Sequence, residues 1–131
     1  MAESRLEGRS ILILEDEYLV ALDVEQTCLE WGARQVTIAR SLESLGERPL
    51  EQADFDAAIL DLRLGGQSTT PFARELEKKG IPFVFATGLT DAGEIADGFP
   101  DVPVVGKPYA GDELARVLAD TIQARRSGCR A

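Results

Sequence analysis

Hydrophobic and polar positions alternate in blocks along this chain of 131 residues. Five short, largely apolar runs are rich in β-branched and aromatic side chains, a pattern that predicts strands buried on both faces of a sheet. These strands are expected at Ser10–Leu14, at Gln35–Ala39 and at residues 57–62, 81–86 and 102–105. The central run ends in Asp61-Leu62, so a carboxylate lies where that strand leaves the sheet.

The segments between these runs have the periodicity of amphipathic helices. Helices are expected at about residues 18–31, 42–46, 70–79, 91–97 and 112–125. In the first helix the apolar side chains are Leu19, Leu22, Cys28 and Leu29, with Ala21 and Val24 beside them. Ser41 is expected to cap the second helix and Pro49 to end it, and residues 50–56 then lead into the central strand. The helix at 91–97 contains Gly93, so it is expected to be the least stable.

Strands that alternate with helices at this spacing predict an α/β fold, with a doubly wound five-stranded parallel sheet and helices on both faces. We expect the flavodoxin-like order 2-1-3-4-5 rather than the six-stranded order of dinucleotide-binding folds, because the chain supplies five strands. A chain of 131 residues suits a single domain. Its core is expected at about residues 9–125, with frayed termini.

The composition excludes several classes of function. A formal net charge of −9 would repel nucleic acid and anionic membranes, so neither is expected as a partner. No apolar stretch approaches the roughly 20 residues of a membrane span, and the first residues lack a signal-peptide core, which predicts a cytoplasmic protein. Cys28 and Cys129 are expected to be reduced. The chain has no histidine, so a metal site must use oxygen ligands.

Polar and charged residues follow the expected strands at the sheet edge where open α/β folds bind ligands. Glu15 and Asp16 follow the first strand, Asp61 ends the third, and Thr87 and Lys107 follow the fourth and fifth. The carboxylates suit Mg²⁺, and a metal and a lysine together would hold a phosphoryl group. The glycine-rich segment 63–68 is expected to be a loop whose backbone approaches that ligand. Because carboxylates are ionised at neutral pH, Asp61 can attack phosphorus directly.

Each of these residues also has a purely structural interpretation. Asp16 would cap the first helix with Glu17 in its first turn, and Asp61 would cap a turn. Thr87 would cap the next helix, and Lys107 would be a solvated surface lysine. Their joint occurrence at the ends of four predicted strands favours the functional interpretation.

Four motifs resemble those of the response-regulator receiver domain, and the resemblance spans the whole chain. They are Leu14-Glu15-Asp16-Glu17, Leu60-Asp61-Leu62, Ala86-Thr87-Gly88 and Lys107-Pro108. The resemblance implies that Asp61 accepts a phosphoryl group from a histidine kinase or a histidine-phosphotransfer protein. It further implies that Asp16, Asp61 and the backbone carbonyl of Arg63 ligate Mg²⁺ and that Glu15 acts through a metal-bound water. Thr87 and Lys107 would bind the phosphoryl oxygens.

Residues 82–88 are also similar to the signature of the single-domain FAT GUY receivers of alphaproteobacteria, although Thr90 stands where that signature has an aromatic residue. A second departure is Val104, at the fifth-strand position where many receivers carry an aromatic side chain. The resemblance implies a stand-alone domain that changes its protein partners or serves as a phosphate relay or sink. Candidate interfaces are the first helix for the phosphodonor, and the fourth helix and fifth helix for a target or a second copy.

Three other functions are compatible with parts of the pattern. A pseudo-receiver would bind partners without phosphorylation, but the aspartate, threonine and lysine of the site are intact. An aspartyl-phosphate phosphohydrolase would carry its nucleophile after the first strand, with a second acid two residues on, where this chain has Tyr18. A flavin-binding domain would need a neutral phosphate loop there, and this chain has three acids. We expect a phosphoacceptor that assists its own phosphorylation and dephosphorylation rather than a conventional turnover enzyme.

Overall fold

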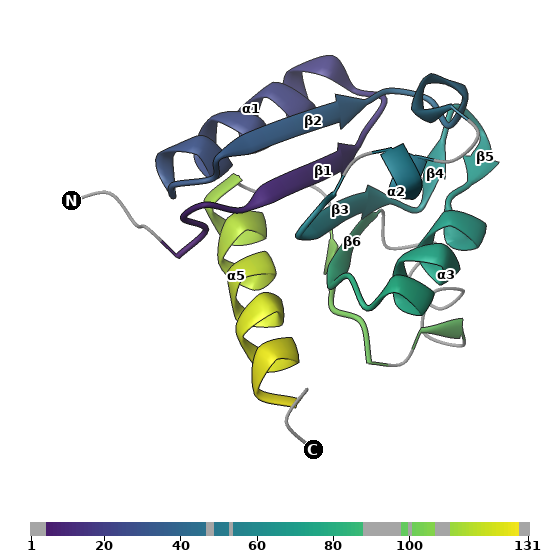
Figure 1. The fold of residues 1–131 in the computed structure, drawn as a ribbon. Coiled ribbons are helices and arrows are strands. Elements are labelled where there is room, and N and C mark those ends of the chain that lie inside the picture. The colour runs from purple at the N-terminus through teal and green to yellow at the C-terminus, as the bar shows by residue number, and fades with distance from the viewer. Residues whose placement is uncertain are drawn as a thin grey trace.

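Five parallel strands form the central sheet of the protein, which we describe from a computed structural model (Figure 1). The structure describes residues 5–46, 49–52, 54–87, 98–99, 101–106 and 111–128. The strands are β1 (Ser10–Leu14), β2 (Gln35–Ala39), β3 (Ala57–Asp61), β6 (Phe83–Thr87) and β7 (Val104–Gly106). Their order in the sheet is β2-β1-β3-β6-β7, which confirms the predicted flavodoxin-like order, since β6 and β7 are its fourth and fifth strands.

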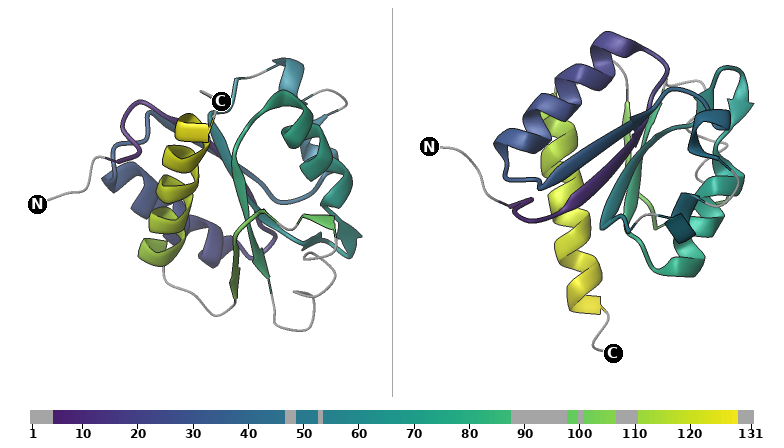
Figure 2. Two further views of the ribbon diagram at one scale, coloured as in Figure 1. Left: turned by 90° about the horizontal axis from the view of Figure 1, so that it is seen from below. Right: turned by 45° about the horizontal axis from the view of Figure 1, so that its top comes forward.

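Helices cover both faces of the sheet (Figure 2). The helices α1 (Tyr18–Glu30) and α5 (Gly111–Gly128) pack together on one face, and α2 (Pro49–Gln52) and α3 (Thr70–Lys79) lie on the other. Side chains alternate between the two cores along each strand: Ile11 and Ile13 join the core under α1 and α5, and Leu12 and Leu14 join the core under α3. Because both faces are covered, all five residues of β1 are buried, which accounts for its unbroken apolar run.

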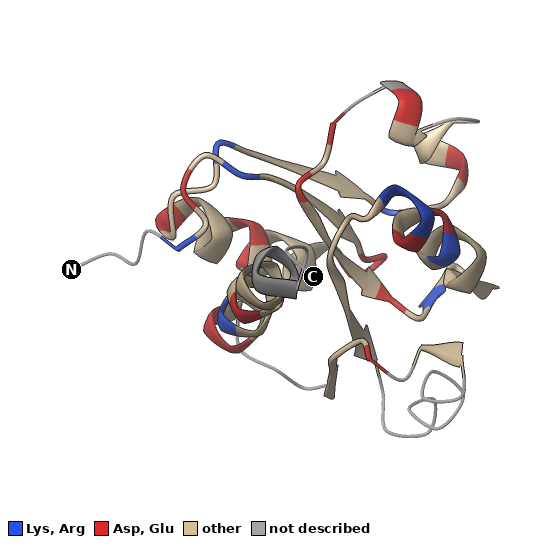
Figure 3. Cartoon of the chain, turned by 60° about the horizontal axis from the view of Figure 1, so that its bottom comes forward, with Lys and Arg blue, Asp and Glu red and all other residues tan. Residues whose placement is uncertain are grey.

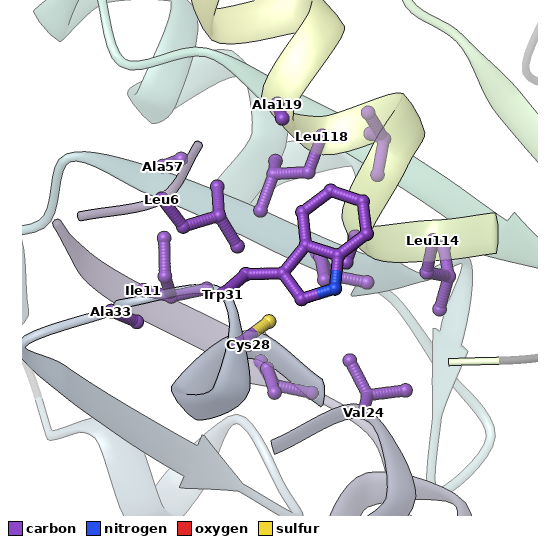
Figure 4. Packing of buried hydrophobic residues seen from close by; sticks show 14 of the residues in the cluster. Leu6, Ile11, Val24, Cys28, Trp31, Ala33, Ala57, Leu114, Leu118 and Ala119 are labelled. Atoms are coloured by element: carbon purple, nitrogen blue, oxygen red, sulfur yellow. The ribbon is translucent and has the colours of Figure 1, made fainter. Parts of the chain in front are cut away.

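Trp31 packs into the core between α1 and α5 (Figure 4). It caps the C-terminal end of α1, and its indole packs among Leu6, Leu114 and Leu118. The N–H of Leu6 donates to the Trp31 carbonyl at 3.0 Å, so the segment before β1 is bonded to the end of α1. Leu6 is fully buried, so the core includes a residue that precedes its predicted start at residue 9.

The buried face of α1 differs from the predicted one. Leu19 is 79% exposed and Leu29 is 46% exposed, whereas Ala21, Val24 and Cys28 are buried. These three residues recur at helical spacing and meet α5, whose first residue, Gly111, comes so close that a Cβ there would lie 2.5 Å from Oγ1 of Thr27. The close approach of α5 selects the face with the smaller side chains, so the longer leucines point to solvent.

The connections hold two elements that the sequence pattern did not predict. Residues 63–68 form an antiparallel hairpin of β4 (Arg63–Leu64) and β5 (Gln67–Ser68), not a loop. Its turn is Gly65-Gly66, both at positive φ, which is typical of two-residue hairpins. Pro49 begins α2 instead of only ending the preceding helix, since proline is well suited to the first turn of a helix.

Several element boundaries also move. The predicted helix at 42–46 is a single 3-10 turn, η1 (Glu43–Leu45), and Ser41 still accepts a hydrogen bond from the Ser44 N–H at 3.2 Å. The fourth and fifth strands begin two residues later than predicted, because Pro82 and Pro103 have no N–H to donate to the ladder. The helix predicted at 91–97 lies outside the described residues, as do Lys107-Pro108, Thr90 and Cys129.

Candidate functional site

Three carboxylates come together at the carboxyl edge of the sheet. Leu14 of β1 pairs with Leu60 of β3, so the residues that follow them, Glu15 and Asp61, emerge side by side. Oxygen atoms of Glu15, Asp16 and Asp61 all lie within 4.8 Å of one another. Glu15 and Asp61 are buried and Asp16 is exposed, so the cluster opens to solvent on one side. The parallel pairing of two buried strands therefore builds the site.

Asp16 does not cap the first helix, contrary to the structural interpretation of the sequence. The residue before α1 is Glu17, which makes no side-chain cap bond, and α1 has no acidic residue in its first turn. The carboxylate of Asp16 accepts a hydrogen bond from the Gly65 N–H instead, at 3.2 Å. The carboxylate of Glu15 reaches forward along the chain, and its Oε2 accepts a hydrogen bond from the Glu17 N–H at 3.1 Å. The acidic segment is thus held in place by backbone donors around it.

Asp61 is the last residue of β3, and the backbone that follows it bends back toward its carboxylate. The N–H of Arg63 donates to Oδ1 of Asp61 at 3.4 Å. The backbone carbonyl of Asp61 accepts from the hydroxyl of Thr69 at 2.7 Å. We did not single out Thr69 from the sequence; its position just before the Thr70-Pro71 start of α3 was the available signal, since helix caps favour threonine.

Thr87 ends β6, next to β3 in the sheet, and is buried. Asp61 pairs with Ala86 of β6, so Thr87 emerges beside the acidic cluster. On its other side Thr87 pairs with Gly106, the last residue of β7. Lys107 follows Gly106 directly in the chain but lies outside the described residues. The strand register therefore brings four of the predicted positions to one edge: Glu15, Asp16, Asp61 and Thr87.

The donor set fits a hard divalent cation. Mg²⁺ prefers carboxylate and carbonyl oxygens, and a cluster of three like charges within 4.8 Å is stabilised by a cation between them. The guanidinium of Arg40 lies nearby, 5.4 Å from the centre of the Tyr18 ring, and donates to the Asp16 carbonyl at 3.5 Å. Among the described helices, α3 and α5 carry both acidic and basic side chains, whereas α1 carries acidic ones only (Figure 3).

Comparison with known proteins identifies the fold. A scan of protein-family models found no match to the sequence, and a comparison with curated proteins found none. A response regulator receiver protein from Sinorhizobium medicae WSM419 is 28% identical with a TM-score of 0.79, and the match covers 92% of this chain and 98% of that one. The non-phosphorylated receiver domain of HemR from Leptospira biflexa is 26% identical with a TM-score of 0.72, over 88% and 94%.

This chain has the fold of response-regulator receiver domains. The response regulator PhyR from Brucella abortus is 26% identical with a TM-score of 0.78; the match covers 95% of this receiver and only 52% of PhyR. The acidic cluster lies where β1 and β3 end. None of the described helices of the receiver is both long and apolar enough to cross a bilayer.

Proposed function

We propose that this receiver accepts a phosphoryl group on Asp61 from the phosphohistidine of a histidine kinase or a histidine-phosphotransfer protein. One observation carries the proposal: Asp61 ends the central strand within 4.8 Å of the carboxylates of Glu15 and Asp16. A nucleophilic carboxylate needs cationic help to approach a phosphoryl group of like charge. The cluster offers a place for that cation directly beside the nucleophile.

In the proposed reaction an oxygen of the Asp61 carboxylate attacks phosphorus of the N-phosphorylated imidazole. The new P–O bond forms as the P–N bond breaks, and the imidazole leaves with the electron pair and takes up a proton from solvent. The Arg63 N–H holds Oδ1 of Asp61 and so orients the carboxylate. The Thr87 hydroxyl and the Lys107 ammonium are proposed to bind the oxygens of the transferred phosphoryl group.

Glu15, Asp16, Asp61 and the Arg63 carbonyl are the residues that would hold Mg²⁺, with Glu15 acting through a bound water. When bound, Mg²⁺ neutralises negative charge on the phosphoryl oxygens. The protein's own contribution is orientation: Asp16 is held by the Gly65 N–H, and Glu15 by the Glu17 N–H. These backbone donors fix the carboxylates before any ligand arrives, so little reorganisation is needed.

We propose that the phosphodonor docks on the exposed apolar side of α1. Tyr18 and Leu19 are 53% and 79% exposed, and they begin the helix immediately after the acidic segment. Two large exposed apolar side chains at the start of a helix offer a partner an apolar contact beside the site. A helical partner seated there would bring its phosphohistidine to the open side of the cluster. A target protein or second copy is proposed to use α5 and the segment 91–97, where the sequence predicts the fourth helix.

This function implies a cytoplasmic location, since kinases of this kind draw on cytoplasmic ATP. The similarity of residues 82–88 to the FAT GUY signature supports placing the chain in that group of receivers. Such a receiver acts by changing its protein partners or by drawing phosphoryl groups from a relay.

The test is ¹⁹F NMR of the protein titrated with beryllofluoride and Mg²⁺, since beryllofluoride mimics an aspartyl-phosphate. Bound fluorine signals are expected in the wild type and in Asp101→Asn, whose carboxylate is exposed and precedes β7, at the opposite edge of the sheet from the cluster. The signals are expected to vanish in Asp61→Asn and without Mg²⁺. Absence of any bound signal in folded wild-type protein would instead favour a pseudo-receiver that binds partners without phosphorylation.

A further inference from the structure

Thr69 is a fully buried polar residue next to the proposed phosphoacceptor, and the proposed reaction gives it no role. Its single hydroxyl hydrogen is shared between two successive backbone carbonyls, that of Asp61 at 2.7 Å and that of Leu62 at 3.0 Å. Its backbone N–H donates to the Leu62 carbonyl as well, at 2.8 Å. One residue thus fixes the backbone where β3 ends.

The Leu62 carbonyl and the Arg63 N–H belong to the same peptide group. A peptide group is planar and rigid, so fixing the direction of its carbonyl also fixes the direction of its N–H. Thr69 holds the carbonyl end with its hydroxyl and its backbone N–H. The N–H end donates to Oδ1 of Asp61 at 3.4 Å. A chain of hydrogen bonds, the last of them long at 3.4 Å, therefore connects the Thr69 side chain to the Asp61 carboxylate.

Thr69 is itself anchored by α3. Its carbonyl accepts the Ala73 N–H at 2.9 Å, the first hydrogen bond of that helix. Ala73 and Leu76 of α3 are buried in the core on this face of the sheet, so Thr69 stands on a rigid element. A donor that stands on a packed helix can hold its acceptor more tightly than one in a free loop.

We infer that Thr69 is a positioning residue for Asp61: its hydroxyl sets the orientation of the Leu62–Arg63 peptide, which in turn orients the attacking carboxylate. The inference rests on the proposed function. Thr69 does not contact the reacting atoms. Its loss is therefore expected to weaken the binding of a phosphoryl mimic without abolishing it. In the sequence, Thr69 is recognisable only as a residue type that is common at the start of a helix.

The experiment compares Thr69→Val, which keeps the shape and removes the hydroxyl, with Thr69→Ser, which keeps the hydroxyl. The matched control is Thr121→Val, because the Thr121 hydroxyl also donates to a backbone carbonyl, that of Val117 at 2.8 Å, on α5. Beryllofluoride affinity is measured by ¹⁹F NMR at saturating Mg²⁺, and folding by circular dichroism. We expect Thr69→Val to bind about tenfold more weakly, and the serine and control variants to bind like the wild type.

The outcomes separate the two proposals. If the wild type binds beryllofluoride and Thr69→Val binds it with the same affinity, the role of Thr69 is overturned and the proposed function stands. Absence of binding in the wild type would overturn the proposed function itself. Should Thr69→Val fail to fold, Thr69→Cys is compared with Thr69→Ser, since a thiol is a weak donor of similar size. Weaker binding by the cysteine variant supports the inference, and equal binding overturns it.

Discussion

The backbone N–H of Gly65 donates to Oδ2 of Asp16 over 3.2 Å, although 49 residues separate them in the chain. Gly65 lies in the turn of the β4–β5 hairpin, and Asp16 lies in the segment between β1 and α1. The hairpin therefore supports an acid of the candidate metal site. Because the turn requires two residues at positive φ, the sequence of the turn affects the geometry of the site.

Replacing Gly66 with alanine is expected to weaken Mg²⁺ binding. Gly66 has φ of 84°, and a side chain there strains the turn by about 1 kcal/mol, which shifts the Gly65 N–H away from Asp16. Gly8→Ala is the matched control: Gly8 has φ of 76°, and a Cβ at either glycine would meet no atom within 4 Å. Both variants should lose similar stability in thermal unfolding, but only Gly66→Ala should bind Mg²⁺ more weakly. Equal Mg²⁺ affinity in the two variants would show that the turn does not support the metal site.

Removing one carboxylate from the cluster is expected to have opposite effects with and without metal. Asp16→Asn relieves repulsion among three acids within 4.8 Å, so the metal-free variant should unfold at a higher temperature than the wild type. Mg²⁺ at a hundredfold excess over its Kd should stabilise the wild type by about 2.7 kcal/mol and the variant much less. Differential scanning calorimetry with EDTA or Mg²⁺ measures both effects. Glu77→Gln, on the exposed side of α3, should behave like the wild type.

Leu19→Ala is expected to affect partner binding and not folding. Leu19 is 79% exposed, so its truncation should change the free energy of unfolding by less than about 0.5 kcal/mol. Leu118→Ala, in the core, should cost about 2–5 kcal/mol. Phosphorylation of Leu19→Ala by a histidine-phosphotransfer protein should slow roughly tenfold, since interface anchors of this kind contribute more than 1 kcal/mol. Phosphorylation by acetyl phosphate needs no docking surface and should keep its rate; a loss there would argue against the docking role.

The buried thiol of Cys28 is expected to make stability fall at alkaline pH. Desolvation by burial, with a smaller contribution from the charge of Glu25, raises the pKa of Cys28 from 9.0 to about 12. The unfolded chain loses this proton first, so the stabilising contribution is complete below pH 9 and is lost as the pH rises toward 12. In a Cys129→Ser background, urea unfolding from pH 8 to 10.5 should show a steeper loss of stability for Cys28 than for Cys28→Ala. Parallel pH profiles would contradict a buried, neutral thiol.

The central strands β1, β3 and β6 were predictable from the sequence because both of their faces are covered and every residue in them is buried, whereas the edge strands β2 and β7 are only partly buried. A strand covered on both faces needs apolar side chains on both faces, and the resulting unbroken apolar run can be recognised in the sequence alone. The candidate acids were predictable for the same reason, since they stand directly after the runs that end β1 and β3. The boundaries at Pro82 and Pro103 moved because a missing N–H shortens a ladder without changing its hydrophobic pattern.

The face that α1 buries was decided by tertiary packing. The helix offers apolar side chains on more than one face, and periodicity alone favoured the leucines. The approach of α5, with Gly111 against Thr27, selects the face with small residues. Local sequence cannot predict this choice, because the surface that competes for α1 comes from the opposite end of the chain.

The sequence by itself determined which residue types stand at the ends of the strands, since parallel pairing carries each strand end to the same edge of the sheet. Tertiary structure decided how those residues are held. The bonds from Gly65 to Asp16 and from Thr69 to Asp61 join backbone groups to partners in other segments. Hydrogen bonds of this kind depend on the path of a loop, which leaves no periodic pattern in the sequence. The residue types of the site could therefore be predicted from the sequence, whereas their geometry required the tertiary structure.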